Sequence, residues 1–320
     1  MACVKIATSV PDLPLSNLPR KAILAAATHR APRAFVNRYG MRLGAARFVA
    51  GETLEQCLDV LASLNEDGLY ANTTLLGEDV ESRAEAERVL AEFTTVLDRI
   101  AERNLRANLA VKLTHLGLVI DEEVAYSNVA ALVDHAAERG NFVRIDMEHS
   151  GVVDVTLRIY RRLRNEGRDN VGCVLQSYLY RTPEDLESLL PLGPNLRLVK
   201  GAYLEPSGIA YPQKADVDDA YRRLLEQALT GGAYLAVATH DETLIEHTIR
   251  FTGAHGIDRD RFEFQMLYGV RPQLQRGLAA RGFKVLVATP YGPEWYPYLM
   301  RRLAERPANL LFLARNLFAR

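Results

Sequence analysis

The feature that most constrains this chain is a repeated two-part pattern, in which a short apolar run is followed by a longer amphipathic helix pattern. The apolar runs have the composition of buried strands, and their starts lie 22 to 37 residues apart, which is typical of βα units. Each connecting helix must pack back onto the sheet, so the alternation predicts parallel strands covered on both faces. The predicted strands begin at Tyr70, Ala107, Asn141, Val171, Leu196, Ala233, Arg261 and Phe283.

Eight such units favour a closed (β/α)8 barrel over an open doubly wound sheet. No G-x-G-x-x-G turn follows any of the strands, as a closed barrel would explain. Helical patterns around residues 20–38 and 53–64 come before the first strand, and residues 1–20 have the composition of a loose arm. We therefore predict an N-terminal arm with helices at residues 1–65, followed by a barrel catalytic domain at residues 66–320.

The local patterns also predict particular helices. Val89, Phe93 and Val96 lie on one apolar stripe with charges opposite, which indicates an amphipathic helix. Thr182 followed by Pro183 is typical of an N-cap with proline at the first helical position.

Composition limits the kinds of partner. The chain has 39 Lys and Arg against 40 Asp and Glu, a formal net charge of −1, so it lacks the basic surplus of a nucleic-acid-binding protein. Its three cysteines, Cys3, Cys57 and Cys173, are odd in number and far apart, which favours a reducing cytoplasm over a disulfide framework. No window reaches about 18 uninterrupted apolar residues, and the N-terminus does not resemble a signal peptide. We expect a cytoplasmic location.

In a barrel of this kind the site lies where the strands end, because the βα loops form one mouth. Polar and aromatic residues follow seven of the predicted strands, although any single strand end can be polar because it reaches solvent. These residues are Lys112 and Thr114, Asp146, Glu148 and His149, Gln176 and Ser177, Lys200 and Tyr203, Thr239, His240 and Asp241, Gln265 and Tyr268, and Thr289 and Tyr291.

Charged residues also occur inside otherwise apolar strands. At the positions of Arg144, Arg197 and Glu263, burial of the charged side chain costs on the order of several kcal/mol unless each charge is paired. Arg144 and Glu263 have two interpretations of equal weight. They belong either to a structural layer of salt bridges that fills the barrel or to a functional site.

The last helix pattern carries a polar face. Tyr298, Arg301, Arg302 and Glu305 lie at i, i+3, i+4 and i+7. Paired arginines hold a carboxylate or phosphate through forked bonds worth about 1.5–3 kcal/mol each. The alternative is a solvated helix face.

Three classes of function fit these residues. A metal-dependent hydrolase or lyase would draw its ligands from the acids and histidines of the strand ends, but no H-x-H or H-E-x-x-H spacing occurs. An oxidoreductase would hold a cofactor across the mouth, and a non-catalytic barrel would bind a small anion through Arg301 and Arg302. The candidate metal ligands are Asp146, Glu148, His149, His240 and Asp241, and the candidate cofactor anchors are Lys200, Gln176 and the Thr239–His240 turn.

Seven segments resemble, in order and spacing, the proline dehydrogenase family of flavoenzymes. They are VKLTHLG, RIDMEHS, VLQSYLYRT, LRLVKGAY, ATHD, FEFQMLYGVRP and YGPEWYPYLMRRLAERP. The resemblance runs from about Gly51 to the C-terminus, and the short monofunctional bacterial form is the nearest in length. It implies a distorted barrel that holds FAD, with the final helix over the mouth, and it implies no metal.

The resemblance also assigns roles at the mouth. Asp146 and Arg197 are the implied catalytic pair, and Arg197 would stabilise negative charge on the reduced flavin. The implied substrate-binding residues are Lys112, Arg301 and Arg302 on the carboxylate, and Tyr203, Leu267 and Tyr298 around the ring. The implied cofactor-binding residues are Met147, Gln176, Arg197, Lys200, Gly201, Ala202, Lys214 near the phosphates, Thr239, His240, Gln265 and Glu305.

The implied reaction is hydride transfer from the proline ring carbon to flavin N5, which gives Δ1-pyrroline-5-carboxylate. The substrate nitrogen must be unprotonated, because its lone pair drives hydride loss. Reduced flavin would pass its electrons to a quinone, which implies transient contact with the inner membrane surface and a peripheral location there.

Three details of this chain qualify the resemblance. Ala288 stands where the family usually carries a tyrosine, and Thr74 where it usually carries an acid. These changes suggest hydroxyproline or another cyclic amino acid as an alternative substrate. Arg197 and Lys200 are three positions apart and would face opposite sides of a strand, so Lys200 either lies beyond the strand or meets the cofactor through its backbone.

Overall fold

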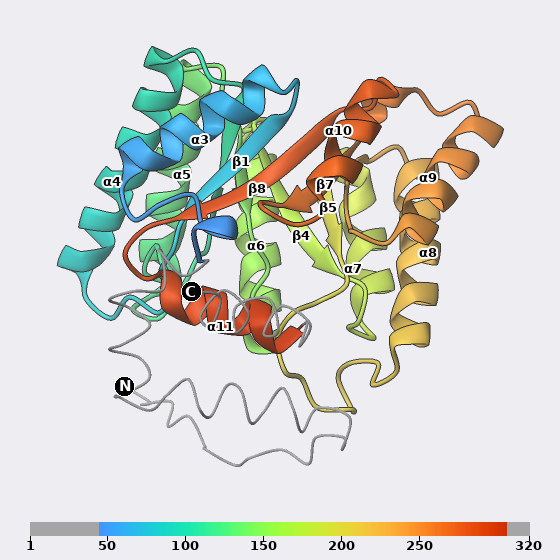
Figure 1. Cartoon of the computed structure of the whole chain (residues 1–320). Coiled ribbons are helices and arrows are strands. Elements are labelled where there is room, and N and C mark those ends of the chain that lie inside the picture. The colour runs from blue at the N-terminus through green and yellow to red at the C-terminus, as the bar shows by residue number, and fades with distance from the viewer. Residues whose placement is uncertain (1–44, 306–320) are drawn as a thin grey trace.

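The computed structural model describes residues 45–305, and the side chains of residues 46–300 within them. In this range eight parallel strands close into a barrel in chain order, with β1 paired to β8 (Figure 1). The predicted (β/α)8 barrel is confirmed. The strands are β1 (Tyr70–Leu75), β2 (Ala107–Val111), β3 (Val143–Ile145), β4 (Val171–Gln176), β5 (Asn195–Val199), β6 (Tyr234–Ala238), β7 (Phe262–Leu267) and β8 (Val285–Tyr291).

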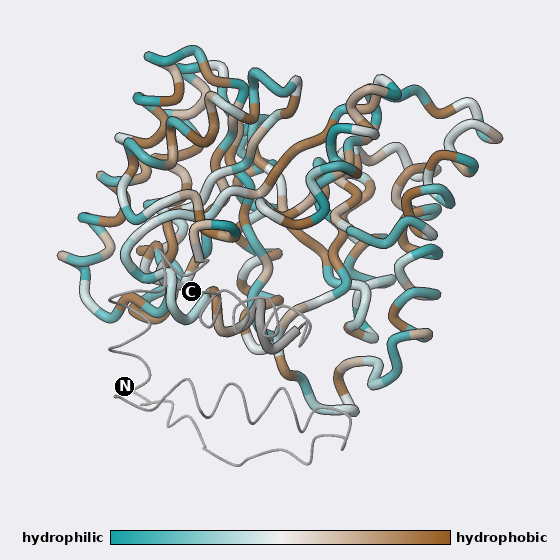
Figure 2. The backbone as a smooth tube through the Cα atoms, viewed as in Figure 1, coloured by the Kyte–Doolittle hydropathy of each residue, from teal (hydrophilic) through white to brown (hydrophobic). Residues whose placement is uncertain are grey.

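Helices surround the strands (Figure 1), and in Figure 2 brown hydrophobic stretches run along the strands while the helices alternate between brown and teal. Val89, Phe93 and Val96 are buried on one face of α4, as the apolar stripe predicts. The helices are α3 (Leu54–Glu66), α4 (Arg83–Glu102), α5 (Glu122–Glu138), α6 (Val153–Asn165), α7 (Thr182–Leu189), α8 (Lys214–Thr230), α9 (Glu242–Ala254), α10 (Pro272–Ala280) and α11 (Trp295–Glu305). Short 3-10 turns are η2 (Ala45–Arg47), η3 (Ser150–Val152), η4 (Leu190–Leu192) and η5 (Arg259–Arg261).

The start of α7 differs from the predicted one. Thr182 is the first helical residue, and Arg181 occupies the N-cap without a side-chain hydrogen bond to the helix. The Thr182 hydroxyl donates to the Gln176 carbonyl at 2.6 Å, so it ties the first turn of the helix to the end of β4. The prediction of Thr182 as N-cap is therefore wrong by one position.

The segment before the first strand packs on the barrel. Thr53 and Gln56 form a capping box at the start of α3, and Cys57 and Leu58 on this helix are buried in the main core. The predicted boundary between residues 1–65 and 66–320 stays a prediction. The predicted arm and the helix around residues 20–38 lie outside the described residues.

A second apolar cluster holds α11 over the mouth. Trp295 and Leu299 of α11 are buried against Phe48 and Val49 of the N-terminal segment and against Leu76, which follows β1. Figure 1 shows α11 lying across one end of the barrel. The final helix therefore covers the strand ends, as the resemblance implies.

Polar groups fill the other end of the barrel. Glu263 is 3% exposed, accepts from Tyr234 at 2.7 Å and pairs with Lys284 at 2.8 Å. Arg144 is buried and donates to the backbone carbonyl and side chain of Asn195. These contacts support the structural interpretation for Glu263, and they show that Arg144 is satisfied by amide oxygens instead of a carboxylate.

Candidate active site

Two cations at the mouth, Lys112 and Arg197, come from the end of β2 and from β5. Lys112, just after β2, donates to Glu78 Oε2 at 2.6 Å, and both side chains are less than a third exposed. Arg197 on β5 donates to Asp146 Oδ1 at 2.7 Å, where Asp146 directly follows β3. The structure therefore places the predicted catalytic pair in direct contact.

Arg197 is held from a second side as well. Its Nη2 donates at 2.7 Å to Oδ1 of Asn72, which lies on β1 across the barrel from β5. The Arg197 side chain is 9% exposed, so its guanidinium is almost wholly removed from water. Two hydrogen bonds to fixed oxygens restrict a buried guanidinium to one orientation.

Three buried polar atoms without a hydrogen-bond partner among the described residues belong to predicted cofactor-binding residues. They are Gln176 Oε1, Gln265 Oε1 and Arg197 Nε. The amide nitrogens of both glutamines are used, since Gln176 donates to the Glu148 carbonyl at 3.2 Å and Gln265 donates to Glu263 at 2.5 Å. Two acceptors and one donor with unmet hydrogen bonds fit a polar heterocycle such as a flavin ring, which presents both donors and acceptors.

His240 has a defined acceptor atom. Its Nε2 accepts from the Leu267 backbone N–H at 2.9 Å, which places the proton of the neutral ring on Nδ1. Thr239, one residue earlier, is buried and accepts from the Asp241 N–H at 3.1 Å. The Thr239–His240 turn is therefore fixed to the neighbouring strand end, as an anchor requires.

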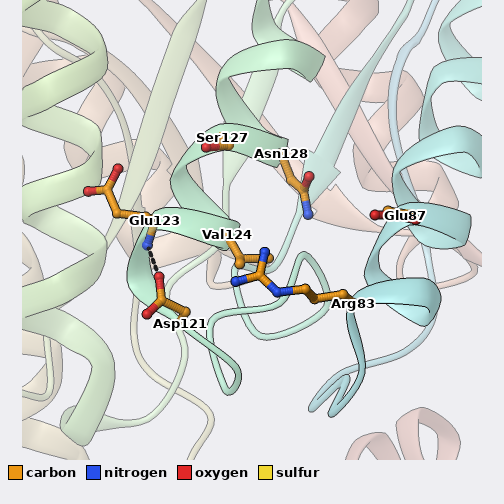
Figure 3. Close-up of a pocket in the computed structure, with 7 residues that line it drawn as sticks. All are labelled: Arg83, Glu87, Asp121, Glu123, Val124, Ser127 and Asn128. Carbon is orange, nitrogen blue, oxygen red and sulfur yellow. Dashed lines mark hydrogen bonds between the residues drawn. The ribbon is translucent and has the colours of Figure 1, made fainter.

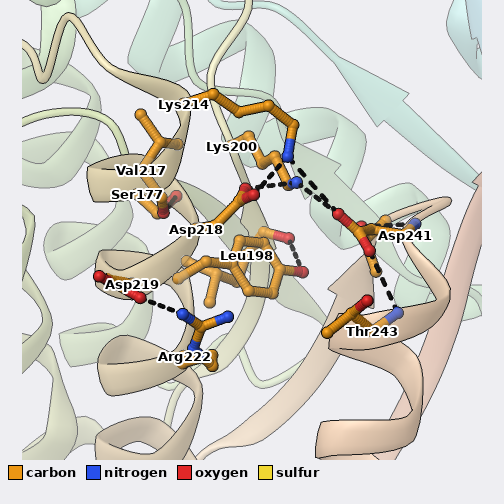
Figure 4. A network of polar contacts seen from close by, with 12 residues as sticks. Ser177, Leu198, Lys200, Lys214, Val217, Asp218, Asp219, Arg222, Asp241 and Thr243 are labelled. Carbon is orange, nitrogen blue, oxygen red and sulfur yellow. Dashed lines mark hydrogen bonds and ion pairs between the residues drawn. The ribbon is translucent and has the colours of Figure 1, made fainter.

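Lys200 lies one residue beyond β5, so the rule that places residues three apart on opposite faces of a strand does not apply to it and Arg197. Its Nζ lies 2.5 Å from Asp218 and 3.2 Å from Asp241 (Figure 4). Lys214 also pairs with Asp218 and lies 3.8 Å from Asp241. The side chain of Lys200 therefore reaches α8 and the loop that follows β6.

The two aspartates of this network stay ionised. Burial favours a higher pKa for Asp218, but hydrogen bonds from Lys200 and Lys214 outweigh it and lower the pKa below its usual range. Burial also favours a higher pKa for Asp241, but the hydrogen bond and the charge of Lys200 outweigh it, so the pKa of Asp241 is lowered. The hydrogen bond to Asp218 raises the pKa of Lys214. The role of Lys214 near phosphates stays a prediction.

The loop after Lys200 requires a glycine. Gly201 has φ +119°, and a Cβ at this position would lie 2.2 Å from the Tyr178 ring. Ala202 and Tyr203 follow it half-buried, and the Tyr203 ring lies 6.3 Å from the His149 ring. On the facing strand end, Met147 is buried.

The two departures from the family pattern lie on neighbouring strands. Ala288 on β8 is paired in register with Asn72 on one side and Leu267 on the other. Ala288, Leu267 and Thr74 are each partly exposed. The small side chain of Ala288 therefore faces the mouth beside Leu267, a predicted substrate contact.

Part of the predicted carboxylate clamp falls outside the described side chains. Tyr298 on α11 is half-buried and packs on the apolar cluster around Trp295. The backbone of Arg301, Arg302 and Glu305 belongs to α11, but their side chains lie outside the described residues.

The candidate metal ligands do not gather in one place. No group of three or more His, Cys, Asp or Glu suited to a metal occurs within residues 45–305. Asp146 and Asp241 pair with cations, and Glu148 accepts from Thr114 at 2.6 Å. Burial raises the pKa of Glu148.

A shallow pocket of about 210 Å³ lies outside the mouth, between α4 and α5 (Figure 3). None of the predicted site residues lines it. Its walls are Arg83, Glu87, Asp121, Glu123, Val124, Ser127 and Asn128.

Comparison with known proteins agrees with this geometry. The family model described as proline dehydrogenase matches residues 57–315. The chain belongs to the proline dehydrogenase family. The proline dehydrogenase of Deinococcus radiodurans is 43% identical over 95% of this chain and 99% of its own length, and proline dehydrogenase 1 of Bacillus subtilis is 43% identical over 88% and 93%. The resemblance carried by the seven segments is confirmed.

Solved structures share the fold of this family member. Proline utilization A from Bdellovibrio bacteriovorus, inactivated by N-propargylglycine, superposes with a TM-score of 0.81 at 23% identity. The match covers 95% of this chain and 38% of that one. At this identity the likeness shows the barrel architecture.

Sequence reasoning missed three residues of this candidate site: Glu78, Asn72 and Asp218. Glu78 and Asp218 carry a charge in loops or on helix faces, where such residues are common. Asn72 and its register partner Asn108 gave the clearer signal, since asparagine is depleted in strands and both lie in predicted ones.

Proposed function

We propose that this proline dehydrogenase family member oxidises L-proline to Δ1-pyrroline-5-carboxylate with FAD as the hydride acceptor. The observation that carries the proposal is the group of buried, unsatisfied polar atoms on Gln176, Gln265 and Arg197, beside the cationic strand ends. The names of the relatives support the same substrate. When bound, FAD would supply a two-electron acceptor for hydride.

Lys112 is proposed to bind the substrate carboxylate. It now pairs with Glu78, so a bound carboxylate would take the place of Glu78 at the ammonium group. By family resemblance, Arg301 and Arg302 complete the clamp, and Tyr203, Leu267 and Tyr298 contact the ring. A carboxylate held at this end orients the ring carbon next to the nitrogen toward the interior of the barrel.

Asp146 and Arg197 are proposed to act together near the reactive edge of the flavin. Asp146 fixes one side of the guanidinium, and the Arg197 cation would stabilise negative charge on a bound flavin. The cofactor would be held by Gln176, Gln265, Thr239 and His240, with the Gly201–Ala202 backbone beside it. Met147, Lys200, Lys214 and Glu305 are further proposed contacts.

We propose that electrons leave to a membrane quinone. Large exposed apolar side chains in residues 46–300 are Val119, Tyr180 and Ile209, and all of them lie on βα loops at the mouth. Such side chains would let the mouth touch a lipid surface without anchoring there. No helix in the described range has the length and apolar character needed to cross a bilayer.

A dye-linked assay tests the reaction. The purified holoenzyme should reduce a water-soluble acceptor with L-proline and release a cyclic imine that an aromatic amino-aldehyde traps. Lys112→Met should raise KM for proline about tenfold to hundredfold, because a charged hydrogen bond is worth about 1.5–3 kcal/mol. Lys284→Met at the opposite end of the barrel is the matched control and should keep the wild-type KM. Absence of the imine would refute the proposal.

A vesicle assay tests the electron acceptor. Vesicles that contain a quinone should support turnover, and Val119→Ser with Ile209→Ser should reduce that turnover while dye-linked turnover stays unchanged. Equal loss with both acceptors would contradict contact through these loops.

A second substrate is favoured by Ala288. The small residue leaves space beside Leu267 that a ring hydroxyl would occupy. We therefore propose trans-4-hydroxyproline as the alternative substrate, to be compared with proline in the wild type and in Ala288→Tyr. The proposal expects the wild type to turn over hydroxyproline and the variant to lose most of that activity. The same preference for proline in both proteins would refute it.

A further inference from the structure

The interior of the barrel holds a hydrogen-bonded line of three side chains that begins at Arg197. Arg197 Nη2 donates to Asn72 Oδ1 at 2.7 Å, and Asn72 Nδ2 donates to Asn108 Oδ1. Asn72 is 3% exposed, and it is paired in register with Asn108 on β2. The line joins β5 to β1 across the barrel and then continues to the neighbouring strand.

The direction of every bond in this line follows from the guanidinium. Arginine only donates, so Asn72 must turn its oxygen toward Arg197. Its amide nitrogen then faces Asn108, which must in turn present its own oxygen. The orientation of both amides is therefore dictated by chemistry, and Asn108 keeps the oxygen of Asn72 aimed at Arg197.

The charge of the line matters as much as its geometry. Arg197 has a single carboxylate partner among the described residues, Asp146 at 2.7 Å, and its second oxygen partner is the neutral amide of Asn72. Aspartate has nearly the same shape as asparagine and would accept the same bond, but with Asp146 already paired it would be a second carboxylate on one guanidinium and would make the group net negative in a site with little water. The neutral amide orients Arg197 and adds no second negative charge.

We propose that Asn72 is a positioning residue for Arg197, that Asn108 fixes its amide, and that the neutrality of Asn72 keeps a second negative charge away from the guanidinium that faces the proposed cofactor. The inference rests on the proposed function, since it assumes a flavin beside Arg197. It assigns no contact with substrate to either asparagine.

Asn72→Asp and Asn108→Asp form a matched pair, because each places one carboxylate in the same inner layer. Asn72→Asp should shift the equilibrium for two-electron flavin reduction about tenfold toward the oxidised form, or about 30 mV, and should slow reduction by proline about tenfold. Asn108→Asp should stay within about twofold of the wild type in both, because its carboxylate still accepts from Asn72. Equal shifts in the two variants, or no shift in Asn72→Asp, would overturn the inference.

Asn108→Leu provides a test that adds no charge. It removes the acceptor for Asn72 Nδ2, so the amide can turn, and reduction by proline should slow about threefold while Asn108→Asp restores the rate. This pair decides the question if Asn72→Asp does not fold, as a melting curve would show. Equal rates in Asn108→Leu and Asn108→Asp would overturn the role of Asn108 and the argument for amide orientation.

Flavin binding and reduction by proline in the wild type distinguish a failure of this inference from a failure of the proposed function. A wild-type protein that binds no flavin, or whose flavin proline does not reduce, would overturn the proposed function and this inference with it. A wild type that is reduced, with unchanged Asn72→Asp, would overturn this inference alone.

Discussion

At the residue scale, the mouth depends on charged and titratable groups in restricted surroundings. His115 is an example beside the proposed substrate site. It is buried, and its ring centroid lies 5.7 Å from that of Phe93 with the two rings nearly perpendicular. Burial, helped by the nearby charge of Lys112, lowers the pKa of His115 to about 4. Between about pH 4 and pH 6.5, the His115 ring is therefore mostly neutral in the folded protein and mostly protonated in the unfolded chain.

The expected consequence is a pH-dependent loss of stability in acid. Between about pH 6.5 and pH 4 the unfolded state binds one more proton at this position, so the free energy of unfolding falls as pH falls, by at most about 3 kcal/mol. His115→Phe keeps an aromatic ring and cannot titrate, so it should flatten this part of the profile. Urea unfolding of both proteins from pH 8 to pH 4 measures the difference. Parallel profiles would contradict the assignment.

At the element scale, α11 is held over the mouth by the segment before α3. Trp295 is 1% exposed, and its Nε1 donates to Glu52 Oε1 at 2.8 Å. Arg47 Nε donates to the Gly269 carbonyl, and a Cβ at Gly269 would lie 1.6 Å from the Arg47 carbonyl oxygen. The segment therefore packs closely on both α11 and the loop after β7.

Loosening α11 should weaken substrate binding more than chemistry. Trp295→Phe keeps the apolar contact and removes the hydrogen bond to Glu52, so KM for proline should rise about fivefold to tenfold with a smaller change in kcat. Glu52→Gln retains an accepting oxygen and serves as the matched control, with KM near the wild-type value. Steady-state kinetics with a soluble dye measures both constants. A fall in kcat at unchanged KM would argue against this role for α11.

At the scale of the whole molecule, the barrel separates a structural end from a functional one. Glu263 and Lys284 lie at the starts of β7 and β8, whereas Asp146 and Lys112 lie beyond strand ends. Burial opposes ionisation of Glu263, but the charge of Lys284 and the hydrogen bonds from Lys284, Gln265 and Tyr234 together outweigh it and hold the pKa of Glu263 below its usual range. Removing the cation would leave a buried carboxylate with neutral donors only.

Lys284→Met should therefore destabilise the fold without affecting the mouth. Breaking a buried pair costs about 3–5 kcal/mol, and the partial exposure of Lys284 places the expected loss at the lower end. Thermal unfolding should show a lower Tm, and adding Glu263→Gln should recover part of it. An altered KM for proline in Lys284→Met would contradict the separation of the two ends.

The sequence was informative where a contact depends on local order along the chain. Strand and helix periodicity predicts the barrel, because each βα unit is defined by its own residues. The strand-end rule brings Lys112, Asp146 and Gln176 to one mouth. Cross-barrel contacts are different: Asn72 meets Arg197 from the opposite strand, and this depends on how all eight strands tilt and pair. The pairing of Lys112 with Glu78 likewise depends on a loop path that periodicity does not describe.

The mouth is proposed to hold a flavin that proline reduces. The decisive measurement is an anaerobic visible absorption spectrum of the purified protein, recorded before and after addition of L-proline. We expect a flavin band that bleaches when proline is added, and a slower bleach in Lys112→Met at the same proline concentration. A protein that shows no flavin band after reconstitution with FAD would refute the proposed function.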